Sequence, residues 1–278
     1  MPQGISLSIG LNAVDPKQYG GWPGILNACE ADAEDMTEIA NAQGFKSQKL
    51  LTTSATRAKV TAAIKAAAAK LKSGDIFMIT YSGHGGQVPD SSGDEDDGQD
   101  ETWCLYDGQI IDDELNVLYS TFAKGVRILV FSDSCHSGTV IKAAYYTGSR
   151  GAPPMSVTAG ETRYRFMPKE IALRTYRDNK AFYDKLQKKT PSGKDAPAVK
   201  ASIISISGCQ DNQLSSDGTF NGLFTGHLLS VWRNGVFQGD YHKFHKEIGR
   251  RMPPDQTPKF FLDGESNSKF EEQEPFTV

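Results

Sequence analysis

The chain has 278 residues and a formal net charge of −4, with 38% hydrophobic and 23% charged residues. This is the composition of an ordinary soluble globular protein, and the length allows one large α/β domain or two small ones. A net negative charge argues against a general nucleic-acid binder, and no apolar run approaches the roughly 18 residues that span a bilayer. The N-terminus has no signal-peptide pattern, and strand-like residues begin almost at once, so we expect neither a leader nor a prodomain.

The four cysteines are far apart in the sequence and form no CxxC pair: Cys29, Cys104, Cys135 and Cys209. A disulfide scaffold normally needs a dense and regular set of cysteines. We therefore predict a protein of the reducing cytoplasm.

Strand-like and helix-like segments alternate along most of the chain. In chain order we expect a strand at 5–11, a helix at 27–43, a strand at 46–52, a helix from Ser54 to about Lys72 and a strand at 75–82. A helix that starts near Asp112 and strands at 126–133 and 201–208 follow. Helices at about 221–233 and 241–251 and a strand at 257–262 come last. Several of the strands are continuous apolar runs, which is typical of buried parallel strands. The pattern predicts an α/β fold with a mostly parallel sheet.

The segment 142–200 interrupts this alternation and has the opposite charge. It contains 13 basic and five acidic residues, so it carries +8 while the rest of the chain carries −12. We interpret the chain as one domain, with the core segments 1–141 and 201–278 joined by this basic insertion. A solvated surface excursion and a regulatory segment are both compatible with the charge pattern.

A histidine and a cysteine follow two of the predicted buried strands. His84 comes after the strand at 75–82, and Cys135 comes after the strand at 126–133. The carboxyl ends of parallel strands form one edge of a sheet, so neighbouring strands would bring the two side chains together. A histidine can then convert the cysteine to a thiolate nucleophile. The backbone amides of Gly85 and Cys135 are the candidate donors to an oxyanion.

Other chemistries fit these residues less well. The chain has no GxSxG motif, which argues against an α/β-hydrolase. A zinc site from His84 and three of the cysteines would lack the usual local pairing of ligands. A structural cysteine and a structural histidine remain the simple alternative to a catalytic pair.

The motifs YSGHGG around His84 and DSCHSGT around Cys135 resemble the two catalytic motifs of the metacaspases, and IISISGCQDNQLSSD at 203–217 resembles the start of their small subunit. The likeness covers roughly 5–140 and 200–262, and it is to a bacterial, type I-like metacaspase. It implies a caspase-like three-layer sandwich, a Cys–His dyad, and cleavage of protein or peptide substrates after Arg or Lys. The segments 1–141 and 201–278 would correspond to the large and small subunits.

The resemblance also implies a substrate pocket and a calcium site. Residues that match Cys29, Asp32 and Asp133 line a deep acidic pocket for the basic side chain in this family. Asp133 lies two residues before the nucleophile, and Asp32 lies one turn after Cys29 on the predicted helix.

The loop 90–101 has seven acidic residues in twelve. By the same resemblance, Asp100, Asp112 and Asp113 are candidate calcium ligands, although the family's further acidic ligand is not matched near Lys142. The alternative is a solvated loop, with no organic cofactor and no metal.

The first part of the insertion is rich in Gly, Pro, Ser and Thr, which predicts an exposed loop that proteases can reach. Arg150, Arg163 and Arg165 are the candidate processing sites of a zymogen, cut by the enzyme itself or by an upstream protease. A basic segment tethered near an acidic pocket could also occupy it as a pseudosubstrate. Two alternatives remain open: a peptidase of the same clan with another specificity, and a binding module without activity.

Overall fold

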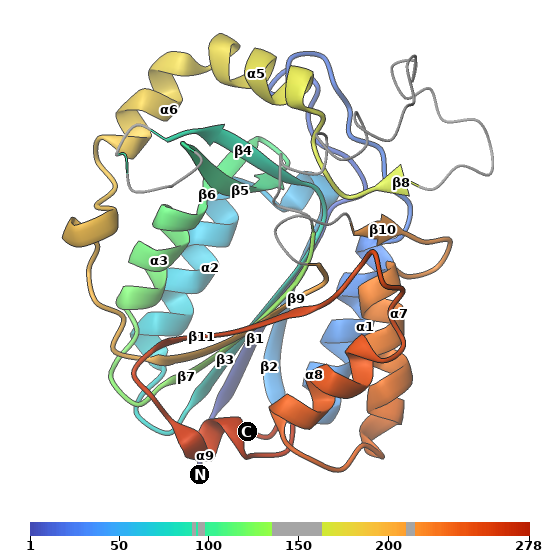
Figure 1. The fold of residues 1–278 in the computed structure, drawn as a ribbon. Helices are drawn as coiled ribbons and strands as arrows, with labels where there is room; N and C mark the ends of the chain where they lie inside the picture. Colours follow the sequence, from blue (N-terminus) through green and yellow to red (C-terminus); the bar gives the residue numbers. More distant parts are fainter. Residues whose placement is uncertain (91–92, 94–97, 135–162, 210–214) are drawn as a thin grey trace.

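A six-stranded sheet runs through the centre of the molecule in the computed structural model (Figure 1). The structure describes the whole chain except residues 91–92, 94–97, 135–162 and 210–214. Five neighbouring strands are parallel and the sixth, at one edge, is antiparallel; in order across the sheet they are β2 (Phe45–Leu51), β1 (Gly4–Gly10), β3 (Ile76–Ser82), β7 (Arg127–Asp133), β9 (Ser202–Ser207) and β11 (Lys259–Gly264). The sheet therefore takes strands from both sides of the basic insertion.

Helices cover both faces of this sheet (Figure 1). One face packs against α2 (Arg57–Lys70) and α3 (Asp112–Ser120), and the other packs against α1 (Cys29–Ala42), α7 (Leu223–Trp232) and α8 (Tyr241–Gly249). Side chains alternate along β3: Phe77 and Ile79 belong to the core on the first face, while Ile76 and Met78 belong to the core on the second. Because both faces are buried, the strand is apolar throughout its middle.

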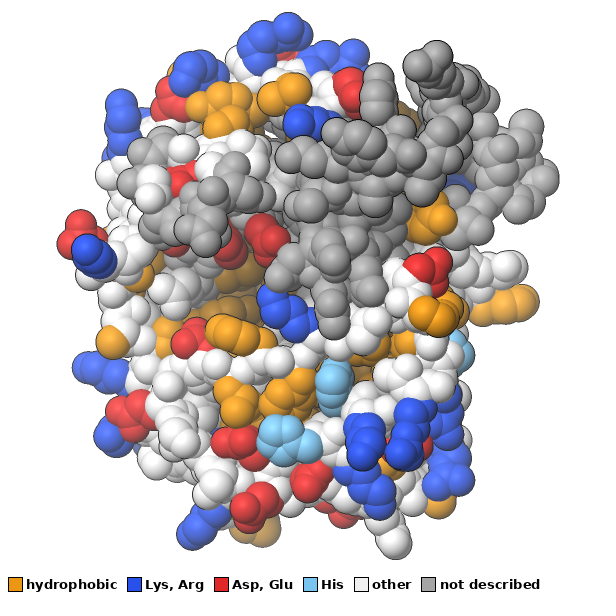
Figure 2. Space-filling view, in the orientation of Figure 1, with side chains coloured by type: hydrophobic (Ala, Val, Ile, Leu, Met, Phe, Trp, Pro, Cys, Tyr) orange, Lys and Arg blue, Asp and Glu red, His pale blue; other side chains and the backbone are white. Residues whose placement is uncertain are grey.

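A second, smaller sheet stands at the carboxyl end of the parallel strands. It contains β4 (Gly85–Pro89), β5 (Gln99–Leu105) and β6 (Gly108–Ile111), all antiparallel. The described part of the insertion passes over it as α5 (Lys169–Asp178) and α6 (Lys180–Gln187), and Lys and Arg side chains gather there at the top of Figure 2. A two-stranded pair completes this end, formed by β8 (Arg163–Tyr164) and β10 (Ser216–Asp217).

Short elements complete the described chain: the 3₁₀ turns Thr52–Ser54, Gly193–Asp195 and Arg233–Gly235, and the last helix α9 (Ser268–Glu271). Cys29, Cys104 and Cys209 are free and buried. Among the described helices, none combines the length and the apolar character that a membrane crossing requires.

The α/β class and the mostly parallel sheet predicted from the sequence are confirmed, with element ends that shift by a few residues. The helix expected from Ser54 begins later, at Arg57, because Thr56 caps α2: its hydroxyl accepts a hydrogen bond from the backbone N–H of Lys59. β3 and β7 are neighbours, with Ser82 in register with Asp133. The two strands that precede His84 and Cys135 therefore end side by side.

Candidate active site

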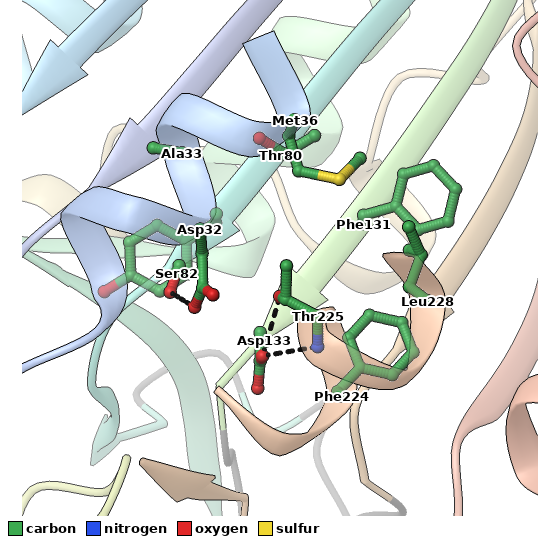
Figure 3. A pocket seen from close by; sticks show the side chains of 11 residues that line it. Asp32, Ala33, Met36, Thr80, Ser82, Phe131, Asp133, Phe224, Thr225 and Leu228 are labelled. Atoms are coloured by element: carbon green, nitrogen blue, oxygen red, sulfur yellow. Dashed lines mark hydrogen bonds between the residues drawn. The ribbon is translucent and has the colours of Figure 1, made fainter. Parts of the chain in front are cut away.

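Three carboxylates from distant parts of the sequence meet at the carboxyl end of the central strands. Asp32 comes from the first turn of α1, Asp133 ends β7, and Asp217 belongs to β10. Their side chains are at most 2% exposed. Figure 3 shows Asp32 and Asp133 facing the same space, with Ser82 beside Asp32. A buried group of like charges needs a counter-ion or many hydrogen bonds, and this one has both.

The counter-ion is the side chain of Arg165, which is completely buried. Its Nη2 lies 2.7 Å from Asp32 Oδ2 and 3.1 Å from Asp217 Oδ1, and its Nη1 lies 3.0 Å from Asp133 Oδ2. Nη1 also donates to the hydroxyl of Ser82 at 2.8 Å and to the backbone carbonyl of Asp133 at 3.2 Å. These carboxylates raise the pKa of Arg165, whereas burial acts in the opposite direction. The guanidinium is therefore charged at all ordinary pH values.

The backbone around α7 orients two of the three carboxylates. The amide N–H of Gly222 donates to Asp32 Oδ1 at 3.0 Å, and Asn221 Nδ2 donates to the same oxygen at 3.0 Å. Asp133 Oδ2 accepts from the amide and the hydroxyl of Thr225, at 3.0 and 2.8 Å (Figure 3). Both carboxylates thus sit at the amino end of α7, where the unpaired N–H groups and the helix dipole favour negative charge.

The third carboxylate is held by the start of α1, because Asp217 accepts from the backbone N–H of Asn27 at 2.7 Å and of Ala28 at 3.3 Å. Cys29 is completely buried in the next position, and burial raises the pKa of its thiol. Burial also raises the pKa of Asp32, while the charge of Arg165 opposes this change. Cys29 is therefore a neutral part of the pocket wall rather than a reactive thiol.

The backbone that carries Arg165 lies between two strands as an extended peptide. Tyr164 is in antiparallel register with Ser216, and the Arg165 amide donates to the carbonyl of Ser215 at 2.9 Å. On the other side, the Gly85 amide donates to the Arg165 carbonyl at 3.0 Å. Such pairing on both sides is the way in which proteins bind an extended peptide by strand addition. The Gly85 amide, which the sequence predicted to be an oxyanion donor, therefore points at the carbonyl of Arg165, and the Arg165 side chain fills the acidic pocket.

His84 immediately precedes Gly85 in the chain, and its ring lies between the Trp22 ring and the backbone of Gly24. Its Nε2 is 3.0 Å from the Gly24 carbonyl, and its ring is 4.6 Å from the Trp22 ring, centre to centre. Burial lowers the pKa of His84 to about 3, and the carbonyl of Gly24 opposes this shift. A neutral ring that donates from Nε2 leaves Nδ1 as the acceptor, and Nδ1 has no hydrogen-bond partner among the described residues. In this tautomer Nδ1 carries the lone pair that a base needs, and the backbone of Phe166 raises the pKa of the same ring.

The other half of the predicted dyad, Cys135, lies outside the described residues, as does Arg150. Arg163 is described and partly buried, and it donates to the Asn27 side chain at 3.1 Å. The expectation that this loop exposes its arginines is wrong for Arg165, which is completely buried. The physical reason is that the nearby carboxylates hold its charge more strongly than solvent does.

The three candidate calcium ligands lie near one another but not in a metal-binding arrangement. Gln187 of α6 donates to Asp100 at 2.6 Å. Burial, followed by repulsion from Asp100 and Asp113, raises the pKa of Asp112 to about 8. Among the residues that the structure describes, no group of three or more His, Cys, Asp or Glu side chains is placed to hold a metal ion. A calcium site here remains a prediction.

Sequence reasoning missed Asp217 and Gly222, which complete the pocket. Both lie in or just after the segment at 203–217 that carried part of the family resemblance, and that was the available signal. Nothing local marks either residue, because their contacts with Arg165 join positions more than 50 residues apart.

Comparisons with known proteins identify relatives of the chain. Residues 13–274 match the caspase domain family, Peptidase_C14. The chain is 29% identical to Metacaspase-1 of Schizosaccharomyces pombe, over 84% of this chain and 60% of that protein. It is 30% identical to Metacaspase-1 of Mycosarcoma maydis, over 80% of this chain and 59% of that protein. The chain therefore spans less than two thirds of the length of these relatives.

Two solved structures are similar as well. A crystal structure of protein GSU0716 from Geobacter sulfurreducens is 62% identical with a TM-score of 0.90, and it covers 100% of this chain and 99% of that one. Caspase-1 from Spodoptera frugiperda has a TM-score of 0.54 and 11% identity, over 94% of this chain and 86% of that one. The second likeness shows the fold alone.

Proposed function

The chain belongs to the caspase domain family, and from this premise we propose that it is a cysteine endopeptidase that cuts after Arg or Lys with a dyad of Cys135 and His84. One observation carries the specificity: a guanidinium is buried among Asp32, Asp133 and Asp217. A pocket with three carboxylates stabilises a cationic side chain and rejects an acidic one. Cys29 and Ser82 line the same pocket.

The position of Arg165 suggests how a substrate binds. A peptide would pair with β10 and place its basic side chain among the carboxylates, with its carbonyl oxygen on the Gly85 amide. The Cys135 thiolate would then attack the carbonyl carbon, and the oxyanion would be held by the amides of Gly85 and Cys135.

His84 serves both halves of the reaction. His84 first takes the proton of the Cys135 thiol, and as the thioacyl-enzyme forms the protonated ring gives that proton to the leaving amine. The neutral ring then takes a proton from water, which attacks the thioester and releases the carboxylate product and the free cysteine. The neutral resting form of His84 supports this second role, as does an Nδ1 that has no hydrogen-bond partner among the described residues.

Arg165 is then an internal occupant of the substrate pocket, and the chain is a zymogen. The bond between Arg165 and Phe166 lies where a scissile bond would lie, since the Arg165 carbonyl accepts from Gly85. Cleavage there by the enzyme itself would separate the segments 1–141 and 201–278 within one folded domain, whereas the buried Arg165 is closed to another protease. Arg163 and Arg150 are the alternative processing sites.

Calcium is the proposed second condition for activity. Asp100, Asp112 and Asp113 would supply oxygen ligands, which this cation prefers. Burial and then repulsion from Asp100 and Asp113 raise the pKa of Asp112, and a bound cation would relieve this repulsion. Full activity in excess chelator would exclude this part of the proposal.

The proposed activity is tested with peptides that end in Arg, Lys or Asp before a fluorogenic group. We expect hydrolysis of the first two and none of the third. Cys135→Ala should abolish hydrolysis, whereas Cys104→Ala and Cys209→Ala should retain it, because neither thiol is at the strand ends that carry the dyad. Turnover by folded Cys135→Ala protein, or preferred cutting after Asp, would contradict the assignment. A thiol-directed peptide probe distinguishes an enzyme from a binding module.

A further inference from the structure

The acidic pocket has two separate binding positions for nitrogen atoms, called seats below. Around Nη1 of Arg165 lie the Ser82 hydroxyl, the Asp133 carboxylate and the Asp133 carbonyl, at 2.8, 3.0 and 3.2 Å. Around Nη2 lie the carboxylates of Asp32 and Asp217, at 2.7 and 3.1 Å. Nε has no partner among the described residues. The pocket therefore recognises the two ends of the guanidinium fork rather than a single positive charge.

A lysine side chain cannot fill both seats. It ends in one nitrogen, and it is shorter than arginine by the length of the fork. An ammonium placed at the Nη2 seat leaves Asp133 without a cation, and one at the Nη1 seat leaves Asp32 and Asp217 without one. These carboxylates are buried, so an unfilled seat is a buried charge without a partner.

Gly222 forms the wall against which the guanidinium lies. A Cβ atom added there would be 2.4 Å from Nη1 and 2.5 Å from both Cζ and Nη2 of Arg165. These are the very atoms by which arginine is longer and wider than lysine. The backbone of Gly222 cannot move aside easily, because its amide donates to Asp32 at 3.0 Å.

From these observations we propose that the pocket selects arginine over lysine, and that Gly222 is the residue that sets this preference. The inference rests on the proposed function, since it concerns the substrate of the same site. It narrows the substrates from basic residues in general to peptide bonds that follow arginine.

The first test is kinetic and uses Arg165→Ala protein, in which the pocket is free. Two peptides that differ only in Arg or Lys before the scissile bond are compared. We expect kcat/KM to be about 10–100-fold higher for the Arg peptide, since a site built for hydrogen bonds rejects an analogue that leaves them unmade. Adding Gly222→Ala should lower kcat/KM for the Arg peptide by about tenfold or more and for the Lys peptide by less.

Gly226→Ala is the matched control. It lies on α7 four residues later, and its added Cβ would meet only Asn221 at 3.7 Å, an ordinary contact. We expect the ratio of the two kcat/KM values to stay unchanged in this variant. Equal cutting after Arg and Lys, or a ratio that Gly222→Ala leaves unchanged, would overturn the inference. If no variant cuts either peptide, the proposed function fails instead.

The second test needs no turnover, so it examines the selectivity even then. In Cys135→Ala protein, the intact chain keeps position 165 beside the pocket. We expect Arg165→Lys to lower the melting temperature nearly as much as Arg165→Ala does. Gly222→Ala should lower it by several degrees when Arg165 is present and by less in the Arg165→Ala protein. An Arg165→Lys protein as stable as its parent would show that one nitrogen satisfies the pocket, and would refute the proposal.

Discussion

Removing Arg165 should activate the protein toward an added peptide while making its fold less stable. The side chain fills the acidic pocket, and its backbone carbonyl occupies the Gly85 amide that a substrate would use. In an uncut chain this segment competes with every outside substrate. Arg165→Ala removes the side chain that holds the segment in place, so both the pocket and the amide become available.

The size of the effect follows from the tether. A flexible tether gives an effective concentration of about 1 mM, so a segment with an intrinsic Kd of about 10–100 μM leaves only about 1–10% of pockets open. Arg165→Ala should therefore raise the rate at low substrate concentration by about 10–100-fold. The same change leaves Asp32, Asp133 and Asp217 buried without a cation, and breaking a buried charge pair lowers the free energy of unfolding by about 3–5 kcal/mol.

The assay compares initial rates for an arginyl peptide with unfolding by urea, at a temperature where each variant is folded. Arg177→Ala is the matched control, since it removes an equal charge from the insertion at an exposed position, 3.5 Å from Asp178. This control should change neither quantity appreciably. A folded Arg165→Ala protein that cuts no faster than its parent would refute the idea that Arg165 blocks the pocket. Unchanged stability would refute the argument from buried charge.

Three further predictions concern single groups. In Arg165→Ala protein, Asp133→Asn should lower kcat/KM for arginyl peptides by about 30-fold or more, because truncating one partner of a buried charge pair costs about 2–5 kcal/mol; an unchanged value would contradict the pocket assignment. The folded-state pKa of His84, about 3, lies below its unfolded value of 6.5. Its contribution to stability is therefore complete above pH 6.5 and is lost as pH falls from there toward 3. In Cys135→Ala protein, His84→Gln should flatten the plot of unfolding free energy against pH over this range. The folded-state pKa of Asp112, about 8, lies above its unfolded value of 3.8. Its contribution to stability is therefore present below pH 3.8 and is lost as pH rises from there toward 8, so Asp112→Asn should gain stability relative to the parent over this range. Calcium at pH 8 should stabilise the parent but not the variant.

The sequence predicted the framework well because its signals are local. Continuous apolar runs such as 75–82 and 126–133 can be buried on both faces only in the middle of a covered sheet, and they became the adjacent strands β3 and β7. The Gly-rich turns after these strands indicated the edge where chemistry would occur. The small sheet of β4, β5 and β6 was not predicted, since its strands are short and one borders the acidic loop.

The pocket was predictable only in part, for a different reason. Asp32 and Asp133 were named through the family resemblance, but their third partner, Asp217, approaches from a two-stranded pair that no local pattern indicates. Arg165 was predicted to be a processing site because it was expected to be accessible. It is instead buried, and its contacts are with positions 32, 133 and 217, which lie far apart in the chain. A basic residue in a loop rich in Gly, Pro and Ser looks solvated until a buried acidic group is placed beside it.

The ion pairs between Arg165 and the three carboxylates would link the stability of the fold to the inhibition of the site. The three carboxylates accept hydrogen bonds from backbone amides at the amino end of α7 and at the start of α1, in addition to their contacts with Arg165. The pocket is therefore preformed, and whichever guanidinium is present at the highest local concentration fills it. In the uncut chain that guanidinium is Arg165, and on the proposed function the contacts that stabilise the fold would also block the site. An activated protein must lose part of this stability, and an arginyl substrate restores it by mass action. We therefore expect the activated form to be most stable while it is bound to substrate, and least stable when it is idle.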